Sequence, residues 1–366
     1  MPPNTERAPE PGATPRAAAT PALRVVVGLD VGGTSSTAGV LAADGAVLAV
    51  VQGPGANFRS SPGTVLDHLR AVLAAAAART DARLGARPWQ VDALVAGIAG
   101  AGPAGRDRAV ALLHDALPGT GLPAPATAEV VTDPVVAYAA GAPGPDGALL
   151  LAGTGAVALR VAGFAERARS DGLGWLLGDV GSGVWLALAG LRAAAAHLDG
   201  RAPATALTPA AAERAAAAEA AGTGDPRQDL VRLTDTRSPA ELGSFARTVA
   251  GCAAAGSAVA DGIVAEGVAG LLRSLSVVAD GAADIVLAGS VLTRPGPVRD
   301  GVLAGLRPPG GQRADDARAD DRAARGPRVH DAAAPVVGAL RLAADRAGWA
   351  LPDVAALTSA VGAARG

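Results

Sequence analysis

Two adjacent glycines, Gly32 and Gly33, stand directly after the apolar residues 25–31 and directly before Thr34 and Ser35. The backbone N–H groups of such a turn, with hydroxyl groups beside them, can donate several hydrogen bonds to one phosphate. A purely structural turn between two strands is the alternative that these residues leave open. The pattern favours phosphate binding, and the four residues are its predicted ligands.

The flanks of this turn fit neither common phosphate loop. In a dinucleotide-binding loop a helix follows the glycines, whereas here Asp44-Gly45, a strong signal of a hairpin between two strands, comes ten residues after Thr34. The P-loop of NTPases needs a lysine that reaches the phosphates, and the sequence contains no lysine. Both loops are therefore excluded, and the turn is predicted to join two strands.

Asp30 stands at the end of the strand expected before these glycines. Its carboxylate would repel a phosphate unless a divalent cation lay between the two groups. Magnesium is commonly held by one or two carboxylates, waters and substrate phosphates. Asp30 therefore predicts a magnesium nucleotide, with the aspartate holding metal-bound water; an aspartate that only caps the turn is the alternative.

Gly153-Thr154-Gly155 is a second glycine turn with a hydroxyl group, and it also lies between two apolar runs. A single turn of this kind is weak evidence for phosphate binding, and a purely structural turn is the alternative. The two strand–turn–strand units lie roughly 120 residues apart. Together they predict two domains of related architecture that hold the phosphates of one nucleotide between them.

Two further aspartates are placed where a substrate could reach them. Asp133 follows an apolar run and precedes Pro134, which suits the first turn of a helix. We therefore expect it at the carboxyl end of a strand, facing the cleft between the domains, although a helix N-cap is an equal alternative. Asp179 lies in the glycine-rich residues 172–183, where the backbone is expected to approach a ligand closely.

Composition narrows the classes of function. The 366 residues favour two domains, and the net charge of −2 without a basic run argues against nucleic acid as a partner. Cys252 is the single cysteine, which excludes an intramolecular disulfide and a cysteine-rich metal site. Residues 1–23 are predicted to be a disordered tail and not a signal peptide. Without a long apolar run, no membrane span is expected, and the simplest prediction is a cytoplasmic protein.

The pattern of apolar residues and breakers predicts alternating strands and helices. Strands are expected over residues 24–29, 37–41, 47–51, 91–98, 128–132, 148–152, 156–164 and 284–292, the last running into a glycine turn. Helices are expected over 63–79, 106–117, the segment after Asp133, most of 184–228 and 238–280, and from near Pro335 to Gly348. Residues 310–326 are charged and of low complexity, which predicts a loop or a frayed helix.

Eight motifs in order give the chain a clear resemblance to a known family. It resembles the N-acetylglucosamine kinase and BadF/BadG-type branch of the sugar kinase, Hsp70 and actin superfamily. The motifs are GLDVGGTSS (28–36), GPGANF (53–58), GIAGAG (97–102), VVTDPVVA (130–137), LAGTGAVA (151–158), GLGWLLGDVGSGVWL (172–186), VLAGSV (286–291) and PVVGAL (335–340). Several are weak singly, but the ordered set is specific and spans nearly all of the chain after the tail.

The resemblance implies an α/β fold of two ribonuclease H-like domains, as in actin-like ATPases, with a cleft between them. We expect the first domain over residues 24–141 and the second over 142–366, with helical insertions and a last helix that packs back on the first domain. The resemblance also implies ATP and Mg²⁺ as cofactors and a homodimer as one possible assembly.

The roles that the resemblance implies fall on single residues. Asp133 becomes the general base that takes a proton from a sugar hydroxyl as its oxygen attacks the γ-phosphate, a reaction that depends mainly on positioning and charge. Asn57, Thr154 and Asp179 become sugar ligands. Gly289 and Ser290 join the nucleotide-binding residues on the adenosine side, with a structural turn as the alternative. Trp175 and Phe58 offer apolar faces to a sugar, although core packing is the favoured role for both.

Three positions depart from the family pattern. Val180 replaces an acidic residue, Ala156 replaces a serine, and Val157 replaces an asparagine that touches the sugar in some members. The identity of the sugar is therefore open. The favoured prediction is an ATP-dependent kinase for the 6-hydroxyl of an amino sugar, either N-acetylglucosamine or glucosamine. The alternatives are a non-catalytic sugar or nucleotide sensor, and a dehydratase-activating ATPase, which the single cysteine disfavours.

Overall fold

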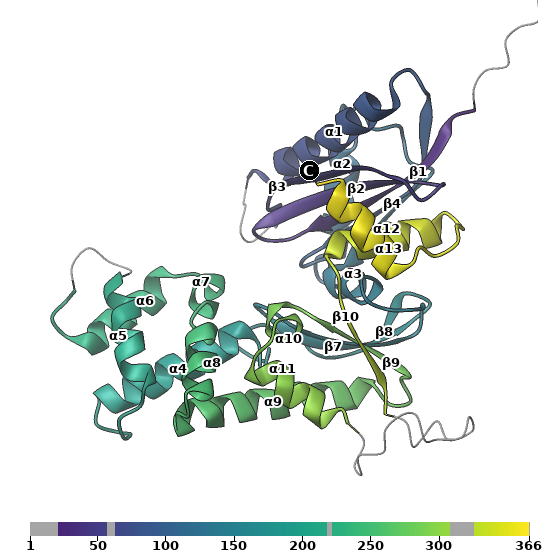
Figure 1. Ribbon diagram of the computed structural model, residues 1–366. Helices are drawn as coiled ribbons and strands as arrows, with labels where there is room; N and C mark the ends of the chain where they lie inside the picture. The colour runs from purple at the N-terminus through teal and green to yellow at the C-terminus, as the bar shows by residue number, and fades with distance from the viewer. Residues whose placement is uncertain (1–20, 57–62, 218–221, 308–325, 366) are drawn as a thin grey trace, which may run out of the picture.

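The computed structural model describes residues 21–56, 63–217, 222–307 and 326–365. Within these ranges the chain forms an upper and a lower lobe, each built on a five-stranded mixed sheet (Figure 1). A helical arm extends from the lower lobe to the left in that view. This architecture confirms the predicted α/β fold class.

The first sheet comes from the hairpin that the sequence predicted. Strands β1 (Leu23–Val31), β2 (Ser35–Ala42) and β3 (Val47–Pro54) are antiparallel, and β4 (Trp89–Ile98) and β5 (Thr127–Thr132) continue the sheet in parallel on the other side of β1, giving the order β3-β2-β1-β4-β5. Leu23 is already part of β1 and is buried, so the predicted tail boundary at residue 23 is wrong by one residue.

The second sheet repeats this topology strand for strand. Strands β6 (Gly147–Ala152), β7 (Ala156–Ala162) and β8 (Ala165–Asp171) are antiparallel, and β9 (Asp284–Ala288) and β10 (Arg328–Asp331) add in parallel, giving β8-β7-β6-β9-β10. The predicted repeat of a strand–turn–strand unit is confirmed. The sequence did not predict β8 and β10, because neither segment is apolar enough to be recognised as a strand. Strand β8 has the charged sequence AERARSD and β10 has only four residues, and the two lie at the opposite edges of the sheet.

Helices cover the outer faces of both sheets. On the first sheet these are α1 (Val65–Leu84) and α2 (Arg106–Ala116). On the second, α9 (Ala258–Val278) and α10 (Ser290–Thr293) contact the strands, and α11 (Pro297–Gly305) packs on α9. The helices α4 (Gly183–Leu198), α5 (Leu207–Ala217), α6 (Pro226–Thr236), α7 (Pro239–Gly243) and α8 (Ala246–Ala254) pack on one another, with α4 and α8 also on α9, and build the helical arm. Among the described residues no single helix is long and apolar enough to cross a membrane; α7–α8 with α9 pass that test only as a pair bent by 117°.

Two helices lie between the sheets and join the lobes. They are α3 (Asp133–Ala139) and α12 (Pro335–Arg346), which share one buried core with the inner faces of both sheets. Glycines permit the close approach: a Cβ on Gly338 would lie 2.0 Å from the carbonyl oxygen of Val136, and one on Gly28 would lie 2.5 Å from the backbone nitrogen of Leu340. The last long helices therefore return to the first lobe, as α12 contacts β1, and α13 (Val354–Ala363) follows it.

The remaining differences from the sequence prediction concern short or interrupted helices. Helices α11 and α13 were not predicted, and the long alanine-rich helical stretches are divided into shorter helices. Alanine favours helix at every position, so an alanine-rich segment gives little sign of where a helix ends. The charged residues 310–326 lie almost entirely outside the described part of the chain.

Candidate functional site

The turn Gly153-Thr154-Gly155 lies between two cavities. The smaller cavity, of about 370 Å³, is lined by Gly153, Thr154 and Ser290. The larger, of about 800 Å³, is lined by Gly155 and by Asp133 and Asp179. We refer to them as the small cavity and the large cavity. A group held at the turn would therefore be accessible to a molecule in either cavity.

Backbone contacts set the shape of this turn. The N–H of Gly153 donates to the carbonyl of Gly155 at 2.8 Å, and the N–H of Gly183, the first residue of α4, donates to the carbonyl of Gly153 at 2.8 Å. Gly289 has a φ of 82°, and a Cβ there would lie 2.3 Å from the carbonyl oxygen of Ala152. The predicted adenosine-side loop thus packs directly against the predicted phosphate turn, with glycine required at their contact.

Asp179 is held in an unusual conformation at the edge of the large cavity. Its φ is 56°, the residue is 8% exposed, and its carboxylate accepts a hydrogen bond from the N–H of Gly174 at 3.3 Å. The carboxylate of Asp171 accepts from the N–H groups of Asp179 at 2.7 Å and Val180 at 3.0 Å, which fixes this loop. Burial raises the pKa of Asp179. A non-glycine residue at positive φ is uncommon and often marks a functional site.

Asp133 begins α3 at the carboxyl end of β5 and lines the large cavity, which is the position expected from its sequence. Burial raises its pKa, while its own backbone N–H and the nearby Arg169 oppose that rise. Asp30 is partly buried, and burial together with the charge of Asp133 raises the pKa of Asp30 to about 6. The first lobe therefore brings two carboxyl groups close enough to repel each other.

The carboxyl groups of Asp30 and Asp133 supply the kind of oxygen ligand that a magnesium ion prefers. Beside them the hydroxyl of Thr132, which also lines the large cavity, is buried without a hydrogen-bond partner among the described residues. Magnesium accepts such oxygen ligands and needs few of them from the protein, because waters and substrate phosphates complete its shell. The described residues contain no group of three or more His, Cys, Asp or Glu that could hold a metal alone. Magnesium binding by Asp30 fits this donor set and stays a prediction.

The first glycine turn is well formed but does not line either cavity. The N–H of Gly32 donates to the carbonyl of Ser35 at 3.0 Å, and a Cβ on Gly55 would lie 2.2 Å from the carbonyl oxygen of Gly33. The lining of the two cavities, taken over the described residues, does not include Gly32, Gly33, Thr34 or Ser35. Phosphate binding by these four residues therefore stays a prediction. Asn57 and Phe58, predicted near the sugar, lie outside the described residues.

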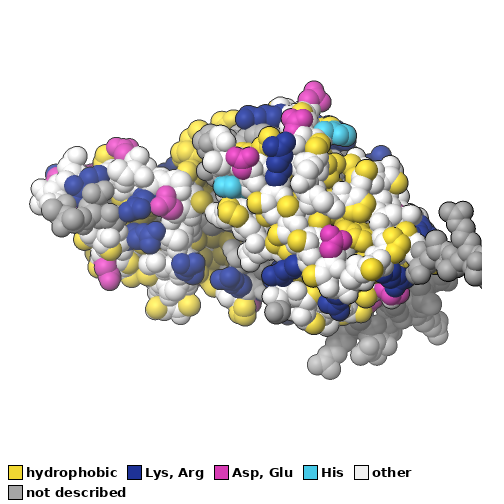
Figure 2. All heavy atoms as spheres, turned by 90° about the horizontal axis from the view of Figure 1, so that it is seen from above, with side chains coloured by type: hydrophobic (Ala, Val, Ile, Leu, Met, Phe, Trp, Pro, Cys, Tyr) yellow, Lys and Arg dark blue, Asp and Glu magenta, His cyan; other side chains and the backbone are white. Residues whose placement is uncertain are grey.

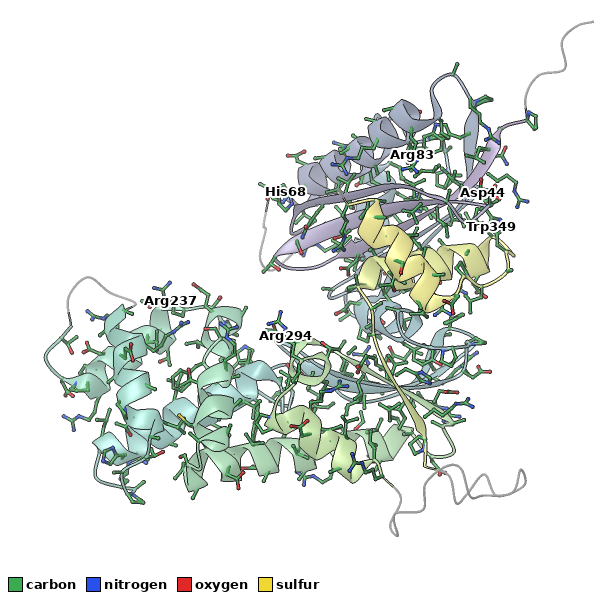
Figure 3. The ribbon with its side chains drawn as sticks, in the orientation of Figure 1. Asp44, His68, Arg83, Arg237, Arg294 and Trp349 are labelled. Atoms are coloured by element: carbon green, nitrogen blue, oxygen red, sulfur yellow. The ribbon has the colours of Figure 1, made fainter. Side chains whose placement is uncertain are left out.

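Four arginines that the sequence analysis did not predict as site residues line the two cavities. Arg108 and Arg169 line the large cavity, and Arg247 and Arg294 line the small one. Figure 3 shows Arg294 extending from the lower lobe toward the space beneath the upper lobe. Seen from above, arginine side chains also flank the waist between the helical arm and the body (Figure 2). With 32 arginines spread along a chain without lysine, no local motif distinguishes these four.

The residues that depart from the family pattern form apolar surface. Ala156 and Val157 are buried and line the large cavity. Val180 packs against α9, where a Cβ on Gly270 would lie 2.3 Å from its Cγ1. Trp175 is 42% exposed, so its favoured role in core packing is wrong; it lies in a loop with Leu173 and Leu176, which are also exposed.

Comparison with known protein families shows which family the chain belongs to. The sequence model of the BadF/BadG/BcrA/BcrD ATPase family matches residues 27–301. The chain belongs to this family. The match confirms the resemblance inferred from the ordered motifs, and membership in this ATPase family implies the use of ATP.

Solved structures show that this BadF/BadG-type protein shares its fold with candidate sugar kinases. A candidate N-acetylglucosamine kinase from Chromobacterium violaceum superposes with a TM-score of 0.65 at 21% identity, covering 87% of this chain and 99% of the other. A second, from Porphyromonas gingivalis, gives a TM-score of 0.56 at 18% identity, covering 86% and 97%. Among curated proteins, none matches the sequence. At these identities the likeness concerns the fold.

Proposed function

We propose that the protein is an ATP-dependent kinase that phosphorylates the 6-hydroxyl of an amino sugar. The observation that carries the proposal is the position of the Gly153-Thr154-Gly155 turn between two cavities, one with Ser290 and the other with Asp133. A phosphoryl transfer enzyme needs a donor and an acceptor on opposite sides of the transferred group. The small cavity takes the nucleotide, and the large cavity takes the sugar.

The small cavity has groups suited to a nucleotide. Its walls carry the hydroxyl-bearing residues Thr154 and Ser290, and the arginines Arg247 and Arg294. A guanidinium group binds phosphate through several donors and also stacks on aromatic rings. Neither Arg247 nor Arg294 has a hydrogen bond or ion pair with another described residue. Both are therefore available to an adenine ring or its phosphates.

In the large cavity Asp133 is the proposed general base. Its carboxylate takes the proton of the 6-hydroxyl as that oxygen forms a bond to the γ-phosphorus, and the bond from this phosphorus to ADP breaks. Magnesium, when bound, neutralises charge on the phosphates, and Asp30 is the residue that would hold it. Asp179 and Thr154 bind sugar hydroxyl groups, and Asp179 is already fixed for this by the contacts of its loop.

The apolar wall of the large cavity favours an acetylated sugar. Ala156 and Val157 line it where a serine and an asparagine stand in related proteins. An acetamide group packs against apolar side chains, whereas a free amine is cationic at neutral pH and needs a carboxylate beside it. N-acetylglucosamine is therefore the first choice of acceptor, with glucosamine second.

A panel of acceptors tests the proposal. ADP release is measured with the purified full chain, ATP and Mg²⁺, and with N-acetylglucosamine, glucosamine, glucose or mannose. We expect the highest kcat/KM with an amino sugar and a product phosphorylated at O6. Binding of sugar and nucleotide without any ADP release would instead identify a non-catalytic sensor. ADP release that does not depend on sugar would identify an ATPase of another kind.

A further inference from the structure

Two arginines of the small cavity have no partner among the described residues. Arg247 and Arg294 line this cavity and are exposed, and neither makes a hydrogen bond or an ion pair within the described part of the chain. The described residues that line the cavity include no aspartate and no glutamate. Both guanidinium groups are therefore free to bind a molecule that enters the cavity.

The two arginines belong to different walls of the cavity. Arg247 lies in α8, and Ala246 and Ala250 of the same helix line the cavity with it. Arg294 directly follows α10, and the lining residues 295–298 lead from it into α11. Helix α11 contacts α8, so the two walls meet at one side of the cavity. A ligand in the cavity can therefore contact a guanidinium group from each wall.

Both arginines lie away from the phosphate turn. Ser290, which shares the turn's side of the cavity, begins α10, and Arg294 comes four residues later, about 6 Å along a helix axis. Gly243 lies against Gly183 beside the turn, where a Cβ on Gly243 would be 3.6 Å from the carbonyl carbon of Gly183. Arg247 again comes four residues later in the chain. The cavity therefore has a phosphate end and a second end that carries the two arginines.

The second end of the cavity suits a flat ring. Beside the two arginines, the lining side chains are apolar and come from Ala246, Ala250, Val291, Pro295, Pro297 and Val298. A guanidinium group stacks on the face of an aromatic ring and is attracted by the electrons of that face. The phosphates of a nucleotide belong at the glycine turn. The base is therefore the part of the nucleotide that reaches the arginines.

The remaining polar side chains of the cavity are poorly suited to distinguish one base from another. Among the described lining residues they are those of Thr154, Ser244 and Ser290. Thr154 and Ser290 belong to the phosphate end. The hydroxyl of Ser244 donates to the carbonyl of Glu241 and accepts from Nη2 of Arg214, each at 2.6 Å. Stacking, in contrast, does not depend on the edge of a base, because every base has an aromatic face.

We propose that Arg247 and Arg294 hold the base of the phosphoryl donor by stacking, so that the donor class is purine nucleoside triphosphates in general and not ATP alone. The inference rests on the proposed function, which makes the small cavity the donor site, and it states how that site selects its donor. GTP should therefore replace ATP in the acceptor assay. UTP and CTP are poorer donors, because a single ring offers less area for stacking.

Calorimetry with nucleoside diphosphates tests the inference without requiring turnover. The full chain is titrated with ADP, GDP, UDP and inorganic pyrophosphate in the presence of Mg²⁺. We expect the dissociation constants of ADP and GDP to agree within about threefold and that of UDP to be about tenfold higher. Pyrophosphate has no base and reports the phosphate contacts alone.

Glutamine variants of the two arginines separate stacking from phosphate binding. Arg247→Gln and Arg294→Gln should each raise the dissociation constants of ADP and GDP about 3- to 30-fold, the range for a cation on an aromatic face. Neither variant should change the dissociation constant of pyrophosphate.

Arg192→Gln is the matched control for these variants. Arg192 is an exposed arginine of α4 that does not line the small cavity, so its replacement should leave every dissociation constant at the native value. All three arginines are exposed, and thermal unfolding confirms that each variant is folded.

The outcomes separate this inference from the function beneath it. If both variants weaken pyrophosphate as much as ADP, the arginines bind phosphates and the inference is overturned. A native protein that binds ADP more than about tenfold tighter than GDP reads the edge of the base, which has the same consequence. If ADP and GDP bind as expected but no sugar of the acceptor panel is phosphorylated, the proposed function alone is overturned. If no nucleotide binds, both fall.

Discussion

At the scale of single residues, the site depends on how burial and neighbouring charges alter two carboxyl groups. Asp133 and Asp30 are partly buried. Burial, together with the charge of Asp133, raises the pKa of Asp30 to about 6. Arg169 opposes the rise for Asp133. A general base works best when its pKa lies near the working pH. The surroundings of Asp133 thus raise its pKa above the ordinary range of a carboxyl group, which is the direction that suits a general base.

Asp133→Asn tests the proposed base. The amide cannot accept the proton of the acceptor hydroxyl, so kcat should fall about 10²- to 10⁴-fold. The dissociation constant of ATP, measured by calorimetry, should remain close to that of the native protein, because Asp133 does not line the small cavity. Turnover near the native rate would contradict the assignment.

Gly155→Ala tests the contact between the phosphate turn and the sugar ligand. A Cβ at this position would lie 2.9 Å from Oδ2 of Asp179, which must then move. Because Asp179 is proposed to bind the sugar, we expect KM for the sugar to rise about tenfold, the effect of losing roughly 1.4 kcal/mol of hydrogen bonding.

Gly102→Ala is the matched control for that variant. Gly102 lines the same cavity, but a Cβ there would have no atom within 4 Å. Its KM for the sugar should match the native value. A similar rise of KM in both variants would mean that added volume in the cavity, and not displacement of Asp179, is responsible.

At the scale of elements, the edge strand β10 is attached to its sheet mainly through one aspartate. Asp284 of β9 is 7% exposed and accepts hydrogen bonds from Arg328 at 2.8 and 2.7 Å and shares one with His330 at 2.7 Å. Both partners are in β10, which has four residues. Such a short strand gains few backbone hydrogen bonds, so the side chains contribute much of its attachment.

This cluster predicts a specific dependence of stability on pH. The hydrogen bonds from Arg328 and then from His330 lower the pKa of Asp284 below 3.8. A group with a lowered pKa stabilises the fold above its unfolded-state pKa and loses that contribution as pH falls through the folded-state value. Asp284→Asn should therefore reduce the free energy of unfolding by about 1–3 kcal/mol at pH 7, and the difference from the native protein should shrink below about pH 4.

Urea unfolding at pH 7 and at pH 3.5 measures this difference, and Asp280→Asn provides the control. Asp280 lies just before β9 and is exposed, and its carboxylate makes no hydrogen bond with a described residue. That variant should unfold like the native protein at both pH values. A deficit of Asp284→Asn that is equally large at both pH values would contradict the linkage.

At the scale of the whole molecule, the two lobes carry opposite walls of one site. The large cavity is lined by residues 99–100 and 102–105 of the first lobe and by residues 172–174 and Asp179 of the second. Leu173 lines this cavity, and the side chains of Leu173, Trp175 and Leu176 in the same loop are exposed. Rotation of the lobes toward each other would cover apolar surface and exclude water from the transferred phosphate.

We therefore predict that sugar together with a non-hydrolysable ATP analogue reduces the radius of gyration measured by small-angle X-ray scattering. Closure excludes water that would otherwise compete with the sugar hydroxyl for the phosphate. The ligands are also added singly, and each alone should produce a smaller change. Identical scattering with and without both ligands would argue against closure.

Much of the site could be predicted from the sequence because its signals are local. The Gly32 and Gly153 turns follow apolar strands, and Asp133 follows a strand and precedes a proline; each pattern depends on adjacent residues. The order of the motifs then indicated the family, and with it the fold. The exact domain limits and the roles of the individual site residues stay predictions.

The sequence by itself determined the repeated strand–turn–strand units and the aspartates at their ends, because hydrogen bonding and steric limits within a few residues decide such features. Only the tertiary structure decided that Gly155 and Asp133 share a cavity with Arg169, and that Gly153 and Ser290 share another. Those groupings depend on how two sheets and the helices α3 and α12 pack, and on contacts between residues far apart in the chain. An arginine in a chain rich in arginine acquires a specific role only from the side chains that surround it.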